Sequence, residues 1–207
     1  MNKIILIILV IITTTCSSEN GVIFSKFEVN PKLSQIAFNQ LTDEEKEANS
    51  INPKYYKNRA RLELHGFRNG VLENKVKGII KTIPLSCTCS IQKDTLQINA
   101  GIDMMGGFGV NIKLHKDKFE SSFYEHTSGI KPYMKQKNST PQSYISVNNN
   151  TQKLVLNQEL IFDKKDQNIY GQLAFKSNTF YENILQDNKI DARYLEGKLW
   201  FICGFSK

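Results

Sequence analysis

Apolar and polar residues alternate over most of the chain from residue 61 onward, with the period of two that is typical of half-buried β-strands. In TLQINAGID, for example, Leu96, Ile98 and Ala100 share one face. Turn residues separate the alternating runs, as at Asn69-Gly70 and Lys93-Asp94. The other clear runs are RLELHGF, GFGVNIKLH, KFESSFYEH, SYISV, KLVLNQELIF, NIYGQLAFKS and LEGKLWFICGF.

These runs predict a mainly β domain over residues 61–207, a single antiparallel β-sandwich or curled β-barrel of about ten strands. Three runs carry a glycine (Gly78, Gly171 and Gly197) just before their alternating apolar residues. A glycine inside a strand often marks a bulge or bend that lets a sheet curl. These glycines fit a closed sheet and chance equally well, because glycine before an alternating run is common.

Residues 31–60 do not alternate, and they predict a short helical or irregular segment ahead of the sheet. Thr42 is followed three residues later by Glu45, which is the spacing of a helix capping box. The segment ends by Asn52-Pro53 and is strongly polar. We therefore expect an exposed element rather than a core helix.

The first residues follow another pattern, in which Lys3 precedes nine consecutive aliphatic residues at 4–12. A positive start, a short apolar run and small polar residues after it are typical of a cleavable signal peptide, here residues 1–15. A membrane-spanning helix needs about 20 apolar residues, so this run is too short to be one.

Cys16, directly after the apolar run, resembles the lipobox cysteine of bacterial lipoproteins, whose thiol is acylated and becomes the mature N-terminus. The usual lipobox has Leu and small residues before the cysteine, whereas this chain has Thr13, Thr14 and Thr15. The resemblance implies a lipid anchor at Cys16, a tether over residues 16–30, and a cell-envelope location at the bacterial outer membrane or facing the periplasm. Ordinary secretion with cleavage near Cys16 is the alternative.

The chain is basic, with 27 Lys and Arg against 20 Asp and Glu and a net charge of +7. Loss of Lys3 with the leader lowers this by only one. The lysines are scattered singly, and the chain contains only Arg59, Arg61, Arg68 and Arg193 as arginines. Nucleic-acid binders more often concentrate Arg and Lys on one element, so we expect no nucleic-acid partner.

Three cysteines lie in the body of the chain: Cys87, Cys89 and Cys203. Cys87 and Cys89 share one face of a strand, where a bond between them would be strained. Export permits disulfides, and a bond from either one to Cys203 is easier and leaves one thiol over. The alternatives are a three-sulfur site for a soft metal such as Cu(I) or zinc, and buried inert thiols.

The glycine-rich stretch at residues 104–109 is not a phosphate-binding loop, because a strand pattern rather than a helix follows it. If the sheet is a barrel, Met104, Met105 and Phe108 could line its mouth as an adaptable apolar site. Tyr124 belongs to an aromatic cluster ahead of a long polar loop. These four residues are the candidate ligand-binding residues.

The sequence predicts no catalytic, cofactor or metal centre. His65, His115 and His126 are isolated from one another, and no nucleophile motif is present. We therefore expect a non-catalytic binding or interaction module, lipid-anchored at the envelope, whose partner is an unknown protein, a glycan or a small apolar ligand. A lipocalin-like carrier of a small apolar ligand is the first alternative, and an envelope enzyme is the second.

Overall fold

The structure is a computed structural model that describes residues 23–34, 58–73, 83–102, 106–160, 167–184 and 189–205. Within these residues, no helix has the length and apolar character needed to cross a membrane. Several predictions fall outside the described residues: the signal peptide, the lipid anchor at Cys16, the capped helix at Thr42, Gly78, Met104 and Met105.

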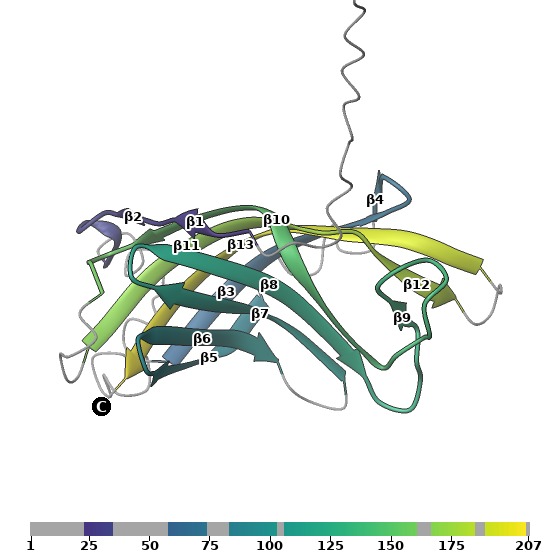
Figure 1. Ribbon diagram of the computed structural model, residues 1–207, viewed down its shortest axis with the longest axis horizontal. Coiled ribbons are helices and arrows are strands. Elements are labelled where there is room, and N and C mark those ends of the chain that lie inside the picture. Colours follow the sequence, from purple (N-terminus) through teal and green to yellow (C-terminus); the bar gives the residue numbers. More distant parts are fainter. Residues whose placement is uncertain are drawn as a thin grey trace, which may run out of the picture.

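Strands dominate the described residues and form one 13-stranded sheet (Figure 1). Their bounds are β1 Ser25–Lys26, β2 Glu28–Val29, β3 Asn58–Arg68, β4 Val71–Leu72, β5 Ile83–Gln92, β6 Thr95–Ile102, β7 Gly106–His115, β8 Lys118–Thr127, β9 Tyr133–Met134, β10 Tyr144–Leu156, β11 Gln167–Ser177, β12 Phe180–Ile184 and β13 Lys189–Phe205.

Eight of these strands close into a barrel in the order β3-β5-β6-β7-β8-β10-β11-β13, with β13 pairing back to β3. Every pair in this ring is antiparallel. The barrel closes because β13 pairs with β11 along one edge and with β3 along the other. The mainly β prediction is therefore confirmed, and a barrel rather than a sandwich is the form it takes.

Two short N-terminal strands complete the barrel wall between β8 and β10. The long strands β8 and β10 pair with each other only from Tyr144 to Asn148 of β10. Beyond that region β1 pairs with β8, with Ser25 opposite Phe119, and β2 runs parallel to β10, with Glu28 opposite Val155. The wall thus includes residues 25–26 and 28–29, which fall inside the tether expected over residues 16–30.

The three remaining strands, β4, β9 and β12, extend the sheet past the closed ring. β12 pairs with the first residues of β13, and β9 pairs with β12. Together with β4 they gather at one end of the barrel, whereas the last described residues of the chain lie at the opposite end (Figure 1).

The alternating apolar residues face the barrel interior, as predicted. Leu96, Ile98 and Ala100 have at most 1% of their surface exposed. Five phenylalanine side chains belong to the buried core beside the aliphatic ones: Phe119, Phe123, Phe175, Phe180 and Phe201. Burial of this apolar surface is the main force that favours the closed barrel.

Gly171 and Gly197 have a different role from the predicted bulges. They sit directly opposite Phe201 and Phe175 in the β11–β13 ladder, and a Cβ on either glycine would collide with the facing ring. The ladder continues through both positions without a register shift. These glycines therefore make room for aromatic rings in the interior.

The tight turns follow the sequence signals. Asn69 and Gly70 have φ angles of 49° and 81° and connect β3 to β4, as a type I′ hairpin requires. Lys93 has a φ of 56° between β5 and β6. Both predicted turns are confirmed.

Candidate functional site

The outer wall formed by β5, β6, β7, β8 and β10 carries a polar groove. Two adjoining cavities, of about 460 Å³ and about 440 Å³, share Asn99 and Asn111. Most of the lining side chains are uncharged amides and hydroxyls. The lining residues are Thr88, Ser90, Gln97, Ile98, Asn99, Asn111, Ile112, Lys113, Ser122 and Ser146 in the first cavity, and Asn99, Asn111, Tyr124, His126, Thr127, Ser143 and Tyr144 in the second.

The strand register explains why these side chains meet. One continuous row crosses five strands, each residue directly opposite the next: Thr88, Asn99, Asn111, Ser122 and Asn148. Directly opposite residues on one face of a sheet have Cβ atoms about 5 Å apart. The row therefore places five uncharged polar side chains side by side across the wall.

A tyrosine ring closes over glycines beside this row. Tyr124 lies opposite Gly109, which in turn lies opposite Gly101, and a Cβ on either glycine would collide with the ring. The Tyr124 hydroxyl donates a hydrogen bond to Asn99 Oδ1 at 3.1 Å. Tyr124 is 8% exposed, whereas Tyr144 is 48% exposed and its ring centroid lies 6.3 Å away. Tyr144 is therefore the accessible ring at this end of the groove.

The predicted ligand-binding residues do not form one site. Phe108 packs against the interior, with its ring centroid 6.5 Å from that of Phe123, whereas Tyr124 lies on the outer face. Met104 and Met105 lie outside the described residues. Of the histidines, only His126 borders the groove. The amide and hydroxyl row was missed, although its signal is present in the sequence: most outward positions of these consecutive strands carry Ser, Thr, Asn or Gln, with Lys113 and Glu120 among the exceptions.

A network of charged residues occupies the barrel end near β4, β9 and β12. Arg68 bonds Glu73 and Glu182, each at 2.8 Å, and contacts Asp191 at 3.3 Å. Arg193, which is 12% exposed, contacts Glu182 at 3.2 Å, Glu125 at 3.6 Å and Glu73 at 3.8 Å. Two arginines thus hold four carboxylates together.

Burial shapes the ionisation of this network. Burial raises the pKa of Glu125, and the nearby Arg193 only partly opposes the shift. Burial also raises the pKa of Tyr133, which hydrogen-bonds Glu125. For Arg68, burial alone would lower the pKa, but hydrogen bonds to Glu73 and Glu182 outweigh it and raise the pKa. Arg68 therefore stays charged, and burial favours the protonated form of Glu125.

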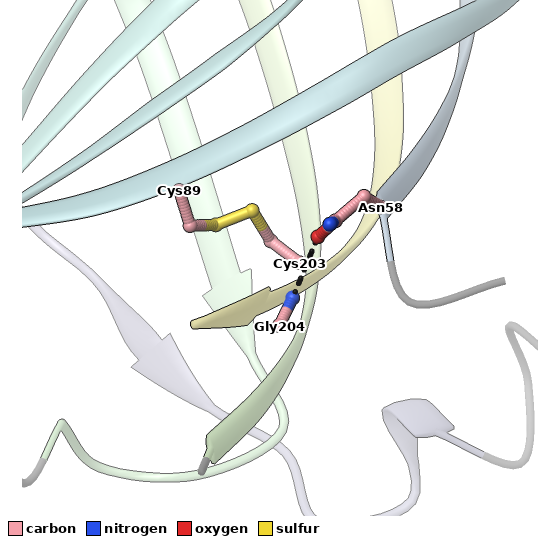
Figure 2. Close-up of a disulfide and its surroundings, with 4 residues drawn as sticks. All are labelled: Asn58, Cys89, Cys203 and Gly204. Atoms are coloured by element: carbon pink, nitrogen blue, oxygen red, sulfur yellow. Dashed lines mark hydrogen bonds between the residues drawn. A yellow bond between two sulfur atoms is a disulfide. The ribbon is translucent and has the colours of Figure 1, made fainter. Parts of the chain in front are cut away.

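The Cys89–Cys203 disulfide joins β5 to β13 at the other end of the barrel (Figure 2). The Cα atoms are 5.9 Å apart, and the neighbouring Asn58 accepts a hydrogen bond from the Gly204 amide at 3.1 Å. Asn58 is the first residue of β3 and lies opposite Cys203, so the disulfide links β5 and β13 where β3 begins. Cys87 stays a free, buried thiol, and burial raises its pKa to about 12. The predicted bond to Cys203 with one thiol left over is confirmed.

Comparisons with known proteins add no relative. No family model matches the chain, no curated protein matches it, and no solved structure matches it. The protein is therefore defined by its own features: a closed eight-stranded β-barrel with an uncharged polar groove on its outer wall.

Proposed function

We propose that the protein is an exported, lipid-anchored cell-envelope binding module whose outer-wall groove recognises a hydroxyl-rich ligand, namely a glycan. The observation that carries this proposal is the row of Thr88, Asn99, Asn111, Ser122 and Asn148 across five neighbouring strands. It favours a glycan among the partners that the sequence allows.

The donors and acceptors of the groove match the chemistry of sugars. Asparagine and glutamine amides both donate and accept hydrogen bonds, as serine and threonine hydroxyls do, so they can pair with sugar hydroxyls in either sense. The exposed ring of Tyr144 offers an apolar surface for a sugar face. The only lysine of the lining, Lys113, is paired with Glu120 at 3.1 Å, which favours an uncharged ligand.

The anchor and the barrel are close together in sequence. Cys16 precedes Ser25, the first residue of β1, by nine positions, and an extended chain spans at most about 3.6 Å per residue. Acylation of Cys16 would therefore hold the barrel within about 30 Å of the membrane surface. The groove would then meet glycans of the envelope or of the cell surroundings.

Interior packing argues against the carrier alternative. A lipocalin-like carrier needs an interior void of about 300 Å³ or more. Here Phe119, Phe123 and Phe201 are buried among the aliphatic residues of the described interior, and both described cavities open on the outer wall. Binding of a fluorescent fatty acid to the purified protein, and its displacement by an unlabelled fatty acid, would instead support the carrier function.

A glycan array probed with the protein purified from membranes tests the proposal. We expect retention on a defined set of neutral glycans, and loss of that retention in Tyr144→Ala. Gln172→Ala is the matched control, because Gln172 lies on β11, outside both cavities. Absence of binding to every glycan, or equal binding by Tyr144→Ala, would contradict a glycan-binding groove.

A further inference from the structure

Three cysteine sulfurs converge at the disulfide end of the barrel. The Sγ atoms of Cys87, Cys89 and Cys203 all lie within 4.8 Å of one another. Cys87 and Cys203 are at most 1% exposed, whereas Cys89 is partly buried. The free thiol of Cys87 therefore lies next to the disulfide bond between the other two sulfurs.

We propose that the reduced protein binds one soft, thiophilic metal ion through these three sulfurs. A three-sulfur donor set selects soft ions over hard ones. Zinc in a structural site takes four ligands. In the part of the chain that the structure describes, no histidine, carboxylate or further cysteine joins the three sulfurs, so this set fits a three-coordinate ion.

The disulfide makes occupancy of this site depend on redox state. In the oxidised protein Cys89 and Cys203 are bonded to each other, and only Cys87 has a free thiol. A dithiol reductant supplies two electrons and two protons to the bond and becomes a disulfide itself. The ion then replaces the thiol protons, which pass to solvent. Cys89 is the least buried of the three and offers the route of access.

The apolar surroundings favour a complex without net charge. Cys87 and Cys203 are at most 1% exposed, and burial opposes a net charge at the site. Arsenite, As(OH)3, reacts with three thiols to give As(SR)3 and three waters, and this complex is neutral. Cu(I) on the same sulfurs leaves a negative charge. Arsenite and Cu(I) both bind sulfur ligands but give complexes of different charge, and the experiment distinguishes between them.

The test uses protein reduced with a dithiol, freed of reductant under anaerobic conditions, and offered arsenite or Cu(I). Mass spectrometry reads the arsenic adduct, and competition with a chromophoric chelator reads Cu(I). We expect one ion per reduced chain and none on the oxidised protein. Binding of only one of the two probes would support the proposal and identify the ion.

Cys87→Ser is the decisive variant, because it removes one donor and keeps the Cys89–Cys203 bond in the oxidised protein. Loss of one of three linked donors should weaken binding on the order of 100-fold. Equal binding by wild type and Cys87→Ser would overturn the proposal, as would absence of binding of either probe. A reduced wild type that has lost its β circular-dichroism spectrum would overturn it too, since the site requires the folded barrel.

Discussion

At one end of the barrel the interior is held by the Cys89–Cys203 disulfide, whereas at the other end two arginines and four carboxylates meet. The disulfide is a covalent link between two strands that are distant in sequence. The charged network is an alternative means of joining elements, because Arg68 and Arg193 bring together β3, β8, β12 and β13. Both ends are occupied by the protein's own side chains.

The difference between the ends bears on where a ligand can bind. Each interior end joins its own groups, through a bond between sulfurs or through ion pairs among partly buried charges, although Arg193 Nε has no hydrogen-bond partner among the described residues. On the outer wall, by contrast, the row that includes Asn99 and Asn111 borders open cavities. We therefore propose recognition on the wall and stability at the ends, and the following changes test that division.

The largest effect is expected at the disulfide end. The Cys89→Ser/Cys203→Ser double variant releases a loop closed over a sequence separation of 114. The chain-entropy model assigns about 4 to 5 kcal/mol to such a loop. Urea unfolding of the double variant and wild type measures the difference in the free energy of unfolding. A loss below about 1 kcal/mol would mean that this link does not stabilise the barrel.

A smaller loss is expected at the charged end. Arg193→Met keeps an unbranched side chain but leaves Glu125 without its arginine and weakens the contacts of Glu182. Removal of one partner from a buried charge network costs about 3 kcal/mol. Urea unfolding of Arg193→Met and wild type measures this loss in the free energy of unfolding. A variant as stable as wild type would show that the network adds nothing to the folded state.

The pH dependence of stability separates the two ends further. Because the pKa of Glu125 is raised in the folded protein, the folded state binds its proton more tightly than the unfolded chain does. The stabilisation from this tighter proton binding is present below the ordinary pKa of a Glu side chain. It is lost as the pH rises through the raised pKa of Glu125. We expect Glu125→Gln, which stays neutral, to lose less stability than wild type over that rise in pH. Parallel stability curves for the two proteins would contradict this.

The smallest effect is expected on the outer wall of β11 and β13. Lys176 pairs with Glu196 at 3.0 Å, and the Lys176 side chain is 40% exposed. Exposed pairs contribute little to stability, because water and salt screen them. Thermal unfolding of Lys176→Ala should therefore match wild type closely. A change as large as that of Arg193→Met would remove the distinction between interior and surface charges.

Local pattern was sufficient for much of the fold. The period of two predicted the strands and the faces they bury, and Asn69-Gly70 and Lys93-Asp94 marked two hairpin turns. Barrel closure was not predictable, because it depends on the pairing of β13 with β3, which are far apart in sequence. The Gly171–Phe201 pair illustrates the same limit. The glycine is visible in the sequence of its own strand, but the Phe201 ring that requires it comes from another strand.

The candidate site was less accessible to sequence reasoning than the fold. Asn99 and Asn111 become neighbours only through strand register, and a shift by one residue would turn them inward. The ion partners of Arg193 come from three other parts of the chain, so spacing along the sequence did not reveal them. The sequence left two possible disulfides, Cys87–Cys203 and Cys89–Cys203, because Cys87 and Cys89 face the same side of one strand.

Calorimetric titration of a glycan selected on the array tests the central claim most directly. The Asn99→Ala/Asn111→Ala double variant removes the two residues shared by both cavities. Loss of two hydrogen-bonding side chains should weaken binding about tenfold or more, whereas Gln172→Ala on β11 should bind as wild type does. Equal dissociation constants for the double variant and wild type would contradict recognition by the outer wall.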